Sequence, residues 1–379
     1  MGDKDKKKAK ISTNKKKEGA VNQDGKSKMV KPKETGKSKM VKPKEEKEDV
    51  TRSGKTKKTA PPQPCVAKCD PNAGDHVRRW FNRALEKGVA GLREEFGQMR
   101  RYCPANMTVH NFTINWELGR NRYKDVPCQD KDRVILKWPG YDYDYIHANY
   151  VPTPKSPKRY ICTQGPLEAT AVDFWHMVLQ EETQAIIMLC NCIEKNMDKC
   201  YQYWPQKPGD SLKFGDVTVI SEKATQVPVV DNIVQTNIKI KATPKRGNPI
   251  EKAIWHFQWI NWPDRGVPPC NHSVIHLLNM VRQCDTSTVV HCSAGIGRTG
   301  TIVSIGYMME RFQNAQTCED MPVIFKEIRN CRPYSIQNDI QYLFIHRVIM
   351  FYFAERYRTY DKSDPRYIKF VEDYNQAIM

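Results

Sequence analysis

Cys292 and Arg298 lie six positions apart in the segment VVHCSAGIGRTG, residues 289–300, and two such side chains could handle a phosphate group. A thiolate is a strong nucleophile, and a guanidinium matches two phosphate oxygens with its planar fork. The residues between them are mostly small: Ser293, Ala294, Gly295, Ile296 and Gly297. Small residues let the backbone wrap tightly and aim successive N–H groups at one oxyanion. The pattern therefore predicts an anion-binding loop that begins with a nucleophilic thiol.

The glycines of the same segment also spell G-x-G-x-x-G, the fingerprint of a dinucleotide-binding fold. That fold needs a second strand ending in an acidic residue about 20 positions further on, which holds the ribose hydroxyls. Glu319 and Asp320 lie at that distance, but the segment that leads to them, RFQNAQTCED, is polar and contains no apolar strand. The dinucleotide interpretation fails at this point, and the thiol–arginine interpretation remains.

The flanking elements are expected to activate the thiol. TSTVVHC before the loop is typical of a strand, and TGTIVSIGYMMERF after it is typical of a helix with Ile302, Ile305 and Met309 on one face. A cysteine in front of a helix N-terminus and an arginine has its pKa lowered from about 8.5 into the range of roughly 3.5 to 7.5. We therefore expect Cys292 to be a thiolate at neutral pH.

Further strands and helices must position this loop. The other strand-like runs are RVILKW, YIHANYV, RYICTQ, AIIMLCN, DVTVISE, NIVQTNIKIKA and AIWHFQWINW. Helical patterns occur at 76–99, in AVDFWHMVLQEE and in SVIHLLNMVRQC, and the first has an apolar stripe of Trp80, Leu85, Val89, Leu92 and Phe96. This order predicts an α/β (α+β) fold with a central twisted mixed β-sheet flanked by helices on both faces.

The amino-terminal part has a different composition. Residues 1–58 carry 21 Lys and Arg against 9 Asp and Glu, and no aromatic residue precedes Trp80. Such a segment cannot bury enough apolar surface to offset the entropy of ordering. We expect a disordered lysine-rich tail over 1–74, in which GKSKMVKPKE occurs at 25–34 and again at 36–45. A folded domain over 75–356 and a C-terminal extension over 357–379, either a docked helix or a loose segment, complete the chain.

The formal net charge of +18 comes mostly from this tail. The charge favours attachment to an acidic partner or an anionic surface, and a solvating linker is the alternative. No apolar run approaches 18 residues and no signal peptide precedes the lysines, so the sequence predicts no transmembrane segment. The 13 cysteines include no Cys-x-x-Cys pair. We therefore expect free thiols, a cytoplasmic location, no metal and no other cofactor.

Eight motifs follow one another between residues 76 and 355. They are NRYKDV (121–126), DYIHANYV (144–151), YICTQGPL (160–167), DFWHMV (173–178), KCYQYWP (199–205), WPDRGVP (262–268), HCSAGIGRTG (291–300) and IQNDIQYLFIHRVI (336–349). In this order they resemble the catalytic domain of the phosphotyrosine-specific, cysteine-dependent protein phosphatases of the non-receptor type. The resemblance implies the cysteine-phosphatase fold and hydrolysis of phosphotyrosine in proteins through a cysteinyl-phosphate intermediate.

The resemblance also implies catalytic roles. Cys292 would attack phosphorus, and Arg298 and the loop amides would hold the equatorial oxygens. Asp264 would protonate the departing tyrosine oxygen and later accept a proton from water. Gln341, assisted by Gln337, would position that water. Two further residues would support the sulfur: Thr299 and His291.

Substrate binding is implied for four other residues. Tyr123 would stack against the substrate ring and form a deep slot that phosphoserine cannot bridge. Asp125 would accept hydrogen bonds from the substrate backbone. Glu194 would orient Arg298, and Lys199 would lie near the acid-bearing WPD segment.

Three positions depart from the family's pattern: His147 stands where Asn is common, Arg265 where an aromatic residue is usual, and Asn338 where Thr is usual. None of them removes a reacting group. Arg265 could alter the packing of the WPD segment or favour acidic substrates. A catalytically weak phosphotyrosine-binding module is therefore the alternative function, and Tyr123 disfavours a dual-specificity phosphatase.

Overall fold

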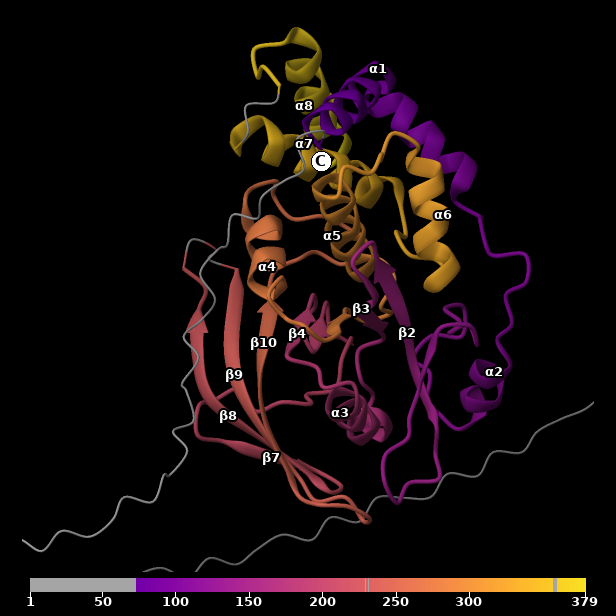
Figure 1. Cartoon of the computed structure of the whole chain (residues 1–379), viewed down its shortest axis with the longest axis vertical. Helices are drawn as coiled ribbons and strands as arrows, with labels where there is room; N and C mark the ends of the chain where they lie inside the picture. Colours follow the sequence, from indigo (N-terminus) through magenta and orange to yellow (C-terminus); the bar gives the residue numbers. More distant parts are fainter. Residues whose placement is uncertain (1–72, 229, 231, 357–359) are drawn as a thin grey trace, which may run out of the picture. The chain divides into compact units, whose positions relative to one another are not determined.

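A central β-sheet with helices around it forms the fold (Figure 1). The computed structural model describes residues 73–228, 230, 232–356 and 360–379, and all of these belong to one compact unit. The sheet strands among them are β1 (Arg133–Ile135), β2 (Tyr145–Thr153), β3 (Ser156–Thr163), β4 (Ala185–Met188), β7 (Ser211–Phe214), β8 (Val217–Gln226), β9 (Ile233–Ala242), β10 (Ile250–Trp259) and β11 (Thr288–His291). Their spatial order is β1-β2-β3-β11-β4-β10-β9-β8-β7. Two shorter strands, β5 (Ile193–Glu194) and β6 (Met197–Asp198), form a separate hairpin.

The four central strands β3, β11, β4 and β10 run parallel, and the outer strands are antiparallel to their neighbours. Strands β4 and β11 are buried at every position. A strand covered on both faces reads as a continuous apolar run rather than an alternating one, which is why AIIM and TVV are so apolar. The predicted α/β class with a mixed sheet is confirmed, and every strand-like run of the sequence contains a strand.

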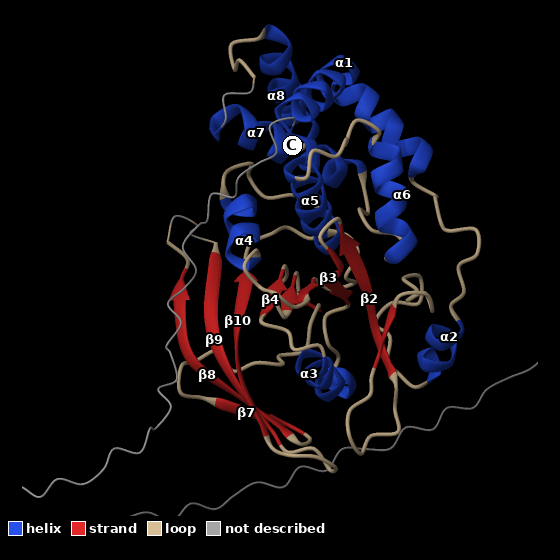
Figure 2. Cartoon of the chain, in the orientation of Figure 1, coloured by secondary structure: helices blue, strands red, loops and turns tan. Residues whose placement is uncertain are grey.

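The described residues form α-helices, several of which cover the two sides of the central strands. They are α1 (Ala73–Met99), α2 (His110–Glu117), α3 (Ala171–Gln180), α4 (Ser273–Val281), α5 (Arg298–Gln313), α6 (Met321–Cys331), α7 (Asp339–Arg356) and α8 (Pro365–Ala377). Figure 2 shows α3 on one side of the central strands and α4 and α5 on the other. Helix α5 contacts β2, β3 and β11, so it holds the strand that precedes the loop at Cys292. No helix of the described residues is both long and apolar enough to cross a bilayer.

Helix α1 differs in two ways from the helix predicted over 76–99. It begins at Ala73, so the last two residues of the predicted tail, 73 and 74, belong to the helix. The rest of the predicted tail, which includes the tandem repeat, lies outside the described residues. Gly88 interrupts it with φ of 61° and ψ of −176°, so two helical segments meet at a kink. The predicted apolar stripe is buried on both sides of this kink.

The carboxyl-terminal extension contains a docked helix. Helix α8 contacts α1 and α7, and its Tyr367, Phe370 and Tyr374 are buried. Phe81 of α1, with no exposed surface, stacks on Tyr360 with ring centroids 4.3 Å apart and lies 5.7 Å from the ring of Tyr367. The ends of the described chain therefore share one apolar contact.

Candidate active site

The phosphate loop, residues 292–297, joins β11 to α5. Gly295 has φ of 70°, and a methyl group on its α-carbon would lie 2.1 Å from the carbonyl oxygen of Thr163. Only glycine fits this left-handed position against the neighbouring strand. Helix α5 begins at Arg298, so the positive end of its dipole lies at the loop. The expected strand, loop and helix are present in that order.

The environment of Cys292 favours the thiolate. Burial by itself would raise the pKa of this thiol, but the charge of Arg298 and hydrogen bonding from Thr299 and Gly295 lower it, and the net pKa lies below its ordinary value. The N–H of Gly295 donates to Sγ at 3.3 Å. A buried thiol with a lowered pKa is typical of a nucleophile rather than of a packing residue.

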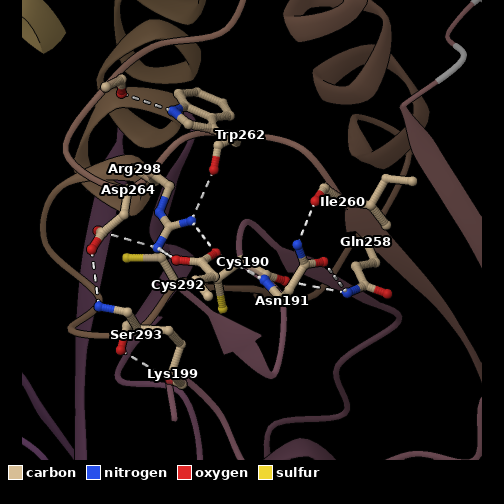
Figure 3. Close-up of polar contacts among 12 residues, drawn as sticks. Cys190, Asn191, Lys199, Gln258, Ile260, Trp262, Asp264, Cys292, Ser293 and Arg298 are labelled. Carbon is tan, nitrogen blue, oxygen red and sulfur yellow. Dashed lines mark hydrogen bonds and ion pairs between the residues drawn. The ribbon is translucent and has the colours of Figure 1, made fainter. Parts of the chain in front are cut away.

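Arg298 is held by two fixed acceptors. Its Nη1 and Nη2 donate to the two carboxylate oxygens of Glu194 at 2.6 and 2.9 Å. Nη1 also donates to the carbonyl oxygen of Trp262 at 3.0 Å (Figure 3). Burial would lower the pKa of Arg298, but Glu194 and the Cys292 thiolate raise it above its usual range. The guanidinium is therefore permanently charged and fixed in orientation.

The acid loop, residues 262–268, brings Asp264 to the same place. Asp264 Oδ1 lies 3.4 Å from Arg298 Nη2, and Oδ2 accepts from Lys199 Nζ at 2.9 Å. Burial would raise the pKa of Asp264, but Lys199, Arg298 and the neighbouring Arg265 lower it, so the carboxyl is ionised in this arrangement. The long contact to Arg298 is one that a phosphate oxygen could replace, because both are anionic acceptors.

Two glutamine side chains approach the phosphate loop at Gly297. A methyl group on Gly297 would lie 2.9 Å from Gln337 Oε1 and 3.0 Å from Gln341 Nε2. Gln341 Oε1 accepts from the backbone N–H of Gln337 at 2.8 Å, which fixes the direction of the amide. Among the described residues, Gln341 Nε2 is a buried donor without a hydrogen-bond partner. Such a donor is costly unless a ligand or water uses it.

Asn338 connects the start of α7 to the acid loop. Its Oδ1 accepts from the N–H of Gln341 at 2.9 Å and caps the helix, and its Nδ2 donates to the carbonyl oxygen of Arg265 at 2.6 Å. Arg265 has φ of 60°, a conformation that a non-glycine residue rarely adopts. Two of the three departures from the family pattern, Arg265 and Asn338, thus contact each other, and the contact joins the acid loop to the start of the helix that carries Gln341.

We expect Asn338→Asp to lower kcat about two- to tenfold with little change in KM, because a net hydrogen bond contributes about 0.5–1.5 kcal/mol. The aspartate keeps the helix cap but faces the Arg265 carbonyl with an acceptor in place of a donor. Steady-state kinetics and thermal unfolding of both proteins provide the measurement. An unchanged kcat in a folded variant would show that the contact does not position the acid loop.

Tyr123 contacts the phosphate loop, and Asp125 follows it two positions later. Ser293 Oγ donates to the carbonyl oxygen of Lys199 at 2.9 Å, so Tyr123 must donate its hydroxyl proton to Ser293 Oγ at 2.8 Å. The tyrosine ring is thereby held upright beside the loop. Asp125 is exposed at the rim, where it can reach a bound backbone.

The predicted residues meet around one cavity of about 550 Å³. Those that line it are Tyr123, Asp125, Lys199, Asp264, Cys292, Ser293, Ala294, Gly297, Arg298, Gln337 and Gln341. The remaining predicted residues do not line it: Glu194, His291, Gly295, Ile296 and Thr299. Glu194, Gly295 and Thr299 act on a lining residue through the contacts above.

His291 belongs to a buried network that the sequence did not reveal. Its Nδ1 lies 3.1 Å from the carbonyl oxygen of Cys292, and its Nε2 lies 2.7 Å from the hydroxyl of Tyr203, which also lies 2.8 Å from His256 Nε2. Burial lowers the pKa of His291 to about 4, so the ring is neutral and donates from Nδ1 to the carbonyl. Tyr203 lies within the motif KCYQYWP, but nothing local indicates its partner.

Arg332 is a second residue that the sequence analysis missed. It is buried and donates to the carbonyl oxygens of Ala294 and Gly295 at 3.1 Å each, and to His147 Nδ1 at 3.1 Å. Burial and the charge of Arg332 lower the pKa of His147 to about 3, and its Nε2–H donates to the carbonyl oxygen of Val126 at 2.8 Å. His147 therefore links the phosphate loop to the segment that carries Tyr123.

Comparison with curated proteins gives consistent relatives. Tyrosine-protein phosphatase non-receptor type 9 of Mus musculus is 36% identical over 285 residues, which cover 70% of this chain and 46% of that protein. Receptor-type tyrosine-protein phosphatase zeta of Homo sapiens is 36% identical over 280 residues, which cover 69% of this chain and 12% of that protein. The chain thus spans less than half the length of these curated relatives.

A solved structure and a family model agree with them. The structure of PTPN18, described as the basis of its fingerprint on distinct HER2 tyrosine phosphorylation sites, matches with a TM-score of 0.66 and 27% identity, covering 74% of this chain and 100% of that one. The model of the family "Protein-tyrosine phosphatase" matches residues 117–351. This match includes every candidate site residue, and the chain belongs to the protein-tyrosine phosphatase family.

Proposed function

We propose that this chain hydrolyses phosphotyrosine in proteins through a cysteinyl-phosphate intermediate. One observation carries the proposal: a thiol with a lowered pKa, a fixed guanidinium and a carboxyl group meet in one cavity. This set supplies a nucleophile, an oxyanion partner and a proton donor for phosphoryl transfer.

The first step forms the sulfur–phosphorus bond. The Cys292 thiolate attacks phosphorus in line while the phosphorus–oxygen bond to tyrosine breaks. Arg298 and the N–H groups of the phosphate loop hold the equatorial oxygens, where negative charge is spread in the transition state. A bound phosphate raises the pKa of Asp264 by like-charge repulsion, so the carboxyl carries the proton that it gives to the tyrosine oxygen.

The second step releases phosphate. A water molecule bound to Gln341 Nε2 attacks phosphorus, Asp264 accepts its proton, and the sulfur–phosphorus bond breaks. The Cys292 sulfur leaves as a thiolate, which the hydroxyl of Thr299 stabilises. Gln341 Nε2, which has no hydrogen-bond partner among the described residues, supports this assignment because it is a donor held next to Gly297 of the loop.

The position of Tyr123 at the cavity supports phosphotyrosine as the substrate class. The Tyr123 ring stands beside the phosphate loop and would pack against an aromatic ring, whereas the short side chain of phosphoserine would hold its phosphate away from Arg298. We expect kcat/KM for a phosphotyrosine peptide to exceed that for the matched phosphoserine peptide by at least about 10²-fold, because a misplacement of about 1 Å can cost that much. Phosphate release from both peptides with a metal chelator present measures this ratio.

Two outcomes of that assay would contradict the proposal. Comparable rates on both peptides would favour a dual-specificity enzyme, and binding of the phosphotyrosine peptide without release of phosphate would favour the binding module. Tyr123→Ala should raise KM for the phosphotyrosine peptide and narrow the ratio, whereas Tyr150→Ala, outside the cavity lining, is the matched control.

For the tail we propose an acidic partner or an anionic surface, supported by the charge of residues 1–58. Binding of the full chain to anionic vesicles or to an acidic polypeptide should weaken as salt rises and should be lost without residues 1–60. The eleven described cysteines are free thiols, which supports a reducing compartment such as the cytoplasm.

A further inference from the structure

Three cysteines outside the proposed chemistry gather beneath the active site. Cys190 follows β4, while Cys192 and Cys200 flank the β5–β6 hairpin. Burial and the neighbouring Cys190 and Cys192 thiols raise the pKa of Cys200, whose Sγ donates to the carbonyl oxygen of Tyr201 at 3.2 Å. Figure 3 draws Cys190 in the same group as Cys292 and Arg298. The three thiols therefore lie next to one another and close to the side chains of the active site.

The backbone places Cys192 and Cys200 next to each other. The N–H groups of Lys199 and Cys200 both donate to the carbonyl oxygen of Cys192, at 2.8 and 3.2 Å. The ladder of the hairpin pairs Ile193 with Asp198, so two successive residues here oppose one, which is a β-bulge. In regular pairing only Lys199 would lie opposite Cys192. The bulge places Cys200 there as well.

The two thiols of this pair have different environments. Cys192 is half-buried, and its contact with Cys200 and the charge of Arg122 lower its pKa although burial opposes them. Cys200 is buried, and burial raises its pKa. An accessible thiol near a guanidinium, with a second thiol beside it, is the arrangement of a peroxide-reactive cysteine and its resolving partner.

We propose that Cys192 and Cys200 form a reversible disulfide when the protein meets a hydroperoxide. The Cys192 thiolate attacks one peroxide oxygen, the oxygen–oxygen bond breaks, and Cys192 becomes a sulfenic acid while the other oxygen leaves as water after taking a proton. The Cys200 sulfur then attacks the Cys192 sulfur, and the sulfenic oxygen leaves as a second water. Two thiols are oxidised by two electrons, and one hydrogen peroxide is reduced to two waters.

The cross-link would act on the residues that hold the reacting groups. It closes the segment that contains Glu194, the partner of Arg298, and Lys199, the partner of Asp264. A methyl group on Gly165 would lie 2.8 Å from the carbonyl oxygens of both Cys292 and Lys199 and 3.1 Å from Cys200 Cβ. Gly165 thus fills the space between the bulge and the start of the phosphate loop, and a shift of the bulge on oxidation would reach the site without involving Cys292.

The test uses the full chain carrying Cys292→Ser, so that the proposed nucleophile cannot consume peroxide. After hydrogen peroxide and alkylation of the remaining thiols, trypsin cuts after Lys195 and Lys199 and separates the two cysteines. We expect a linked pair of peptides that contains Cys192 and Cys200 and separates on reduction, with two thiols lost per chain. Wild-type protein should show the same pair.

Substitutions at three further cysteines make the result specific. Cys192→Ser should abolish the linked pair, whereas Cys331→Ser, at a half-buried thiol whose pKa burial raises to about 11, should leave it intact. Cys200→Ser should trap the sulfenic acid on Cys192, detected with dimedone, and Cys200→Ala serves if the serine variant fails to unfold cooperatively. A disulfide that joins Cys190 to Cys200, or a folded Cys200 variant whose Cys192 resists dimedone, would overturn the proposal.

Discussion

Replacing Cys292 with serine is expected to lower kcat for an aryl phosphate by at least about 10⁴-fold, the scale of losing a nucleophile in a hydrolase. The charge of Arg298 and the N–H of Gly295 stabilise a thiolate at this position. A serine hydroxyl has a pKa far too high for the same groups to ionise it. Because Arg298 and the loop are unchanged, binding of a phosphotyrosine peptide should persist. Single-turnover kinetics and calorimetry measure the two effects.

The matched control for this substitution is Cys331→Ser. It removes a thiol that lies outside the cavity lining, and kcat should stay at the wild-type value. Substantial turnover by the Cys292 variant would mean that another group attacks phosphorus. Loss of peptide binding in that variant would mean that the substitution had damaged the loop itself.

Replacing Asp264 with asparagine is expected to lower kcat by about 10²- to 10⁴-fold, the usual contribution of general acid–base catalysis. The amide is close to the carboxyl group in shape, and its oxygen can still accept from Lys199, so the acid loop should keep this contact although the long contact to Arg298 is lost. It cannot give a proton to the leaving tyrosine oxygen. The variant should therefore bind phosphotyrosine peptide at least as well as the wild type, and a weakened complex would contradict the role of Asp264.

The pH dependence separates the two residues. The Cys292 thiolate is lost as pH falls through the lowered pKa of the thiol, so kcat/KM should fall on the acid side. The Asp264 carboxyl has a lowered pKa in the free protein, but the bound phosphate raises it, so its proton is lost as pH rises in the complex and kcat should fall on the alkaline side. After correction for ionisation of the substrate, Asp264→Asn should keep the acid limb and lose the alkaline one. An alkaline limb that survives in this variant would assign the proton to another group.

The phosphate loop could be predicted from the sequence because its residues are contiguous. A strand, small residues and a helix between residues 286 and 312 are local features, and they suffice to place Cys292 and Arg298 together. Glu194, Asp264 and Gln341 came only from the family resemblance, since no local pattern brings such distant residues to one loop. Their roles in catalysis stay predictions for the experiments above.

What the sequence did not reveal depends on long-range contacts or weak patterns. Arg332 and Tyr203 act through buried hydrogen bonds to backbone carbonyls and rings, which composition and periodicity do not encode. Helix α2 and strand β7 are short and have little apolar signal. The kink at Gly88 was missed because the apolar stripe of α1 continues on both sides of it.

The contact between α1 and α8 decides where the chain can be cut. Both helices lie beyond residues 117–351, the limits of the family match. A fragment trimmed to those limits would lack α1 and α8 and would expose the face of α7 that they cover. A fragment ending at residue 356 would expose Phe81, and the free energy of unfolding would fall by about 1.5–3 kcal/mol for that side chain alone. Crystallisation or inhibitor screening therefore calls for a recombinant piece that runs from Ala73 to the last turn of α8.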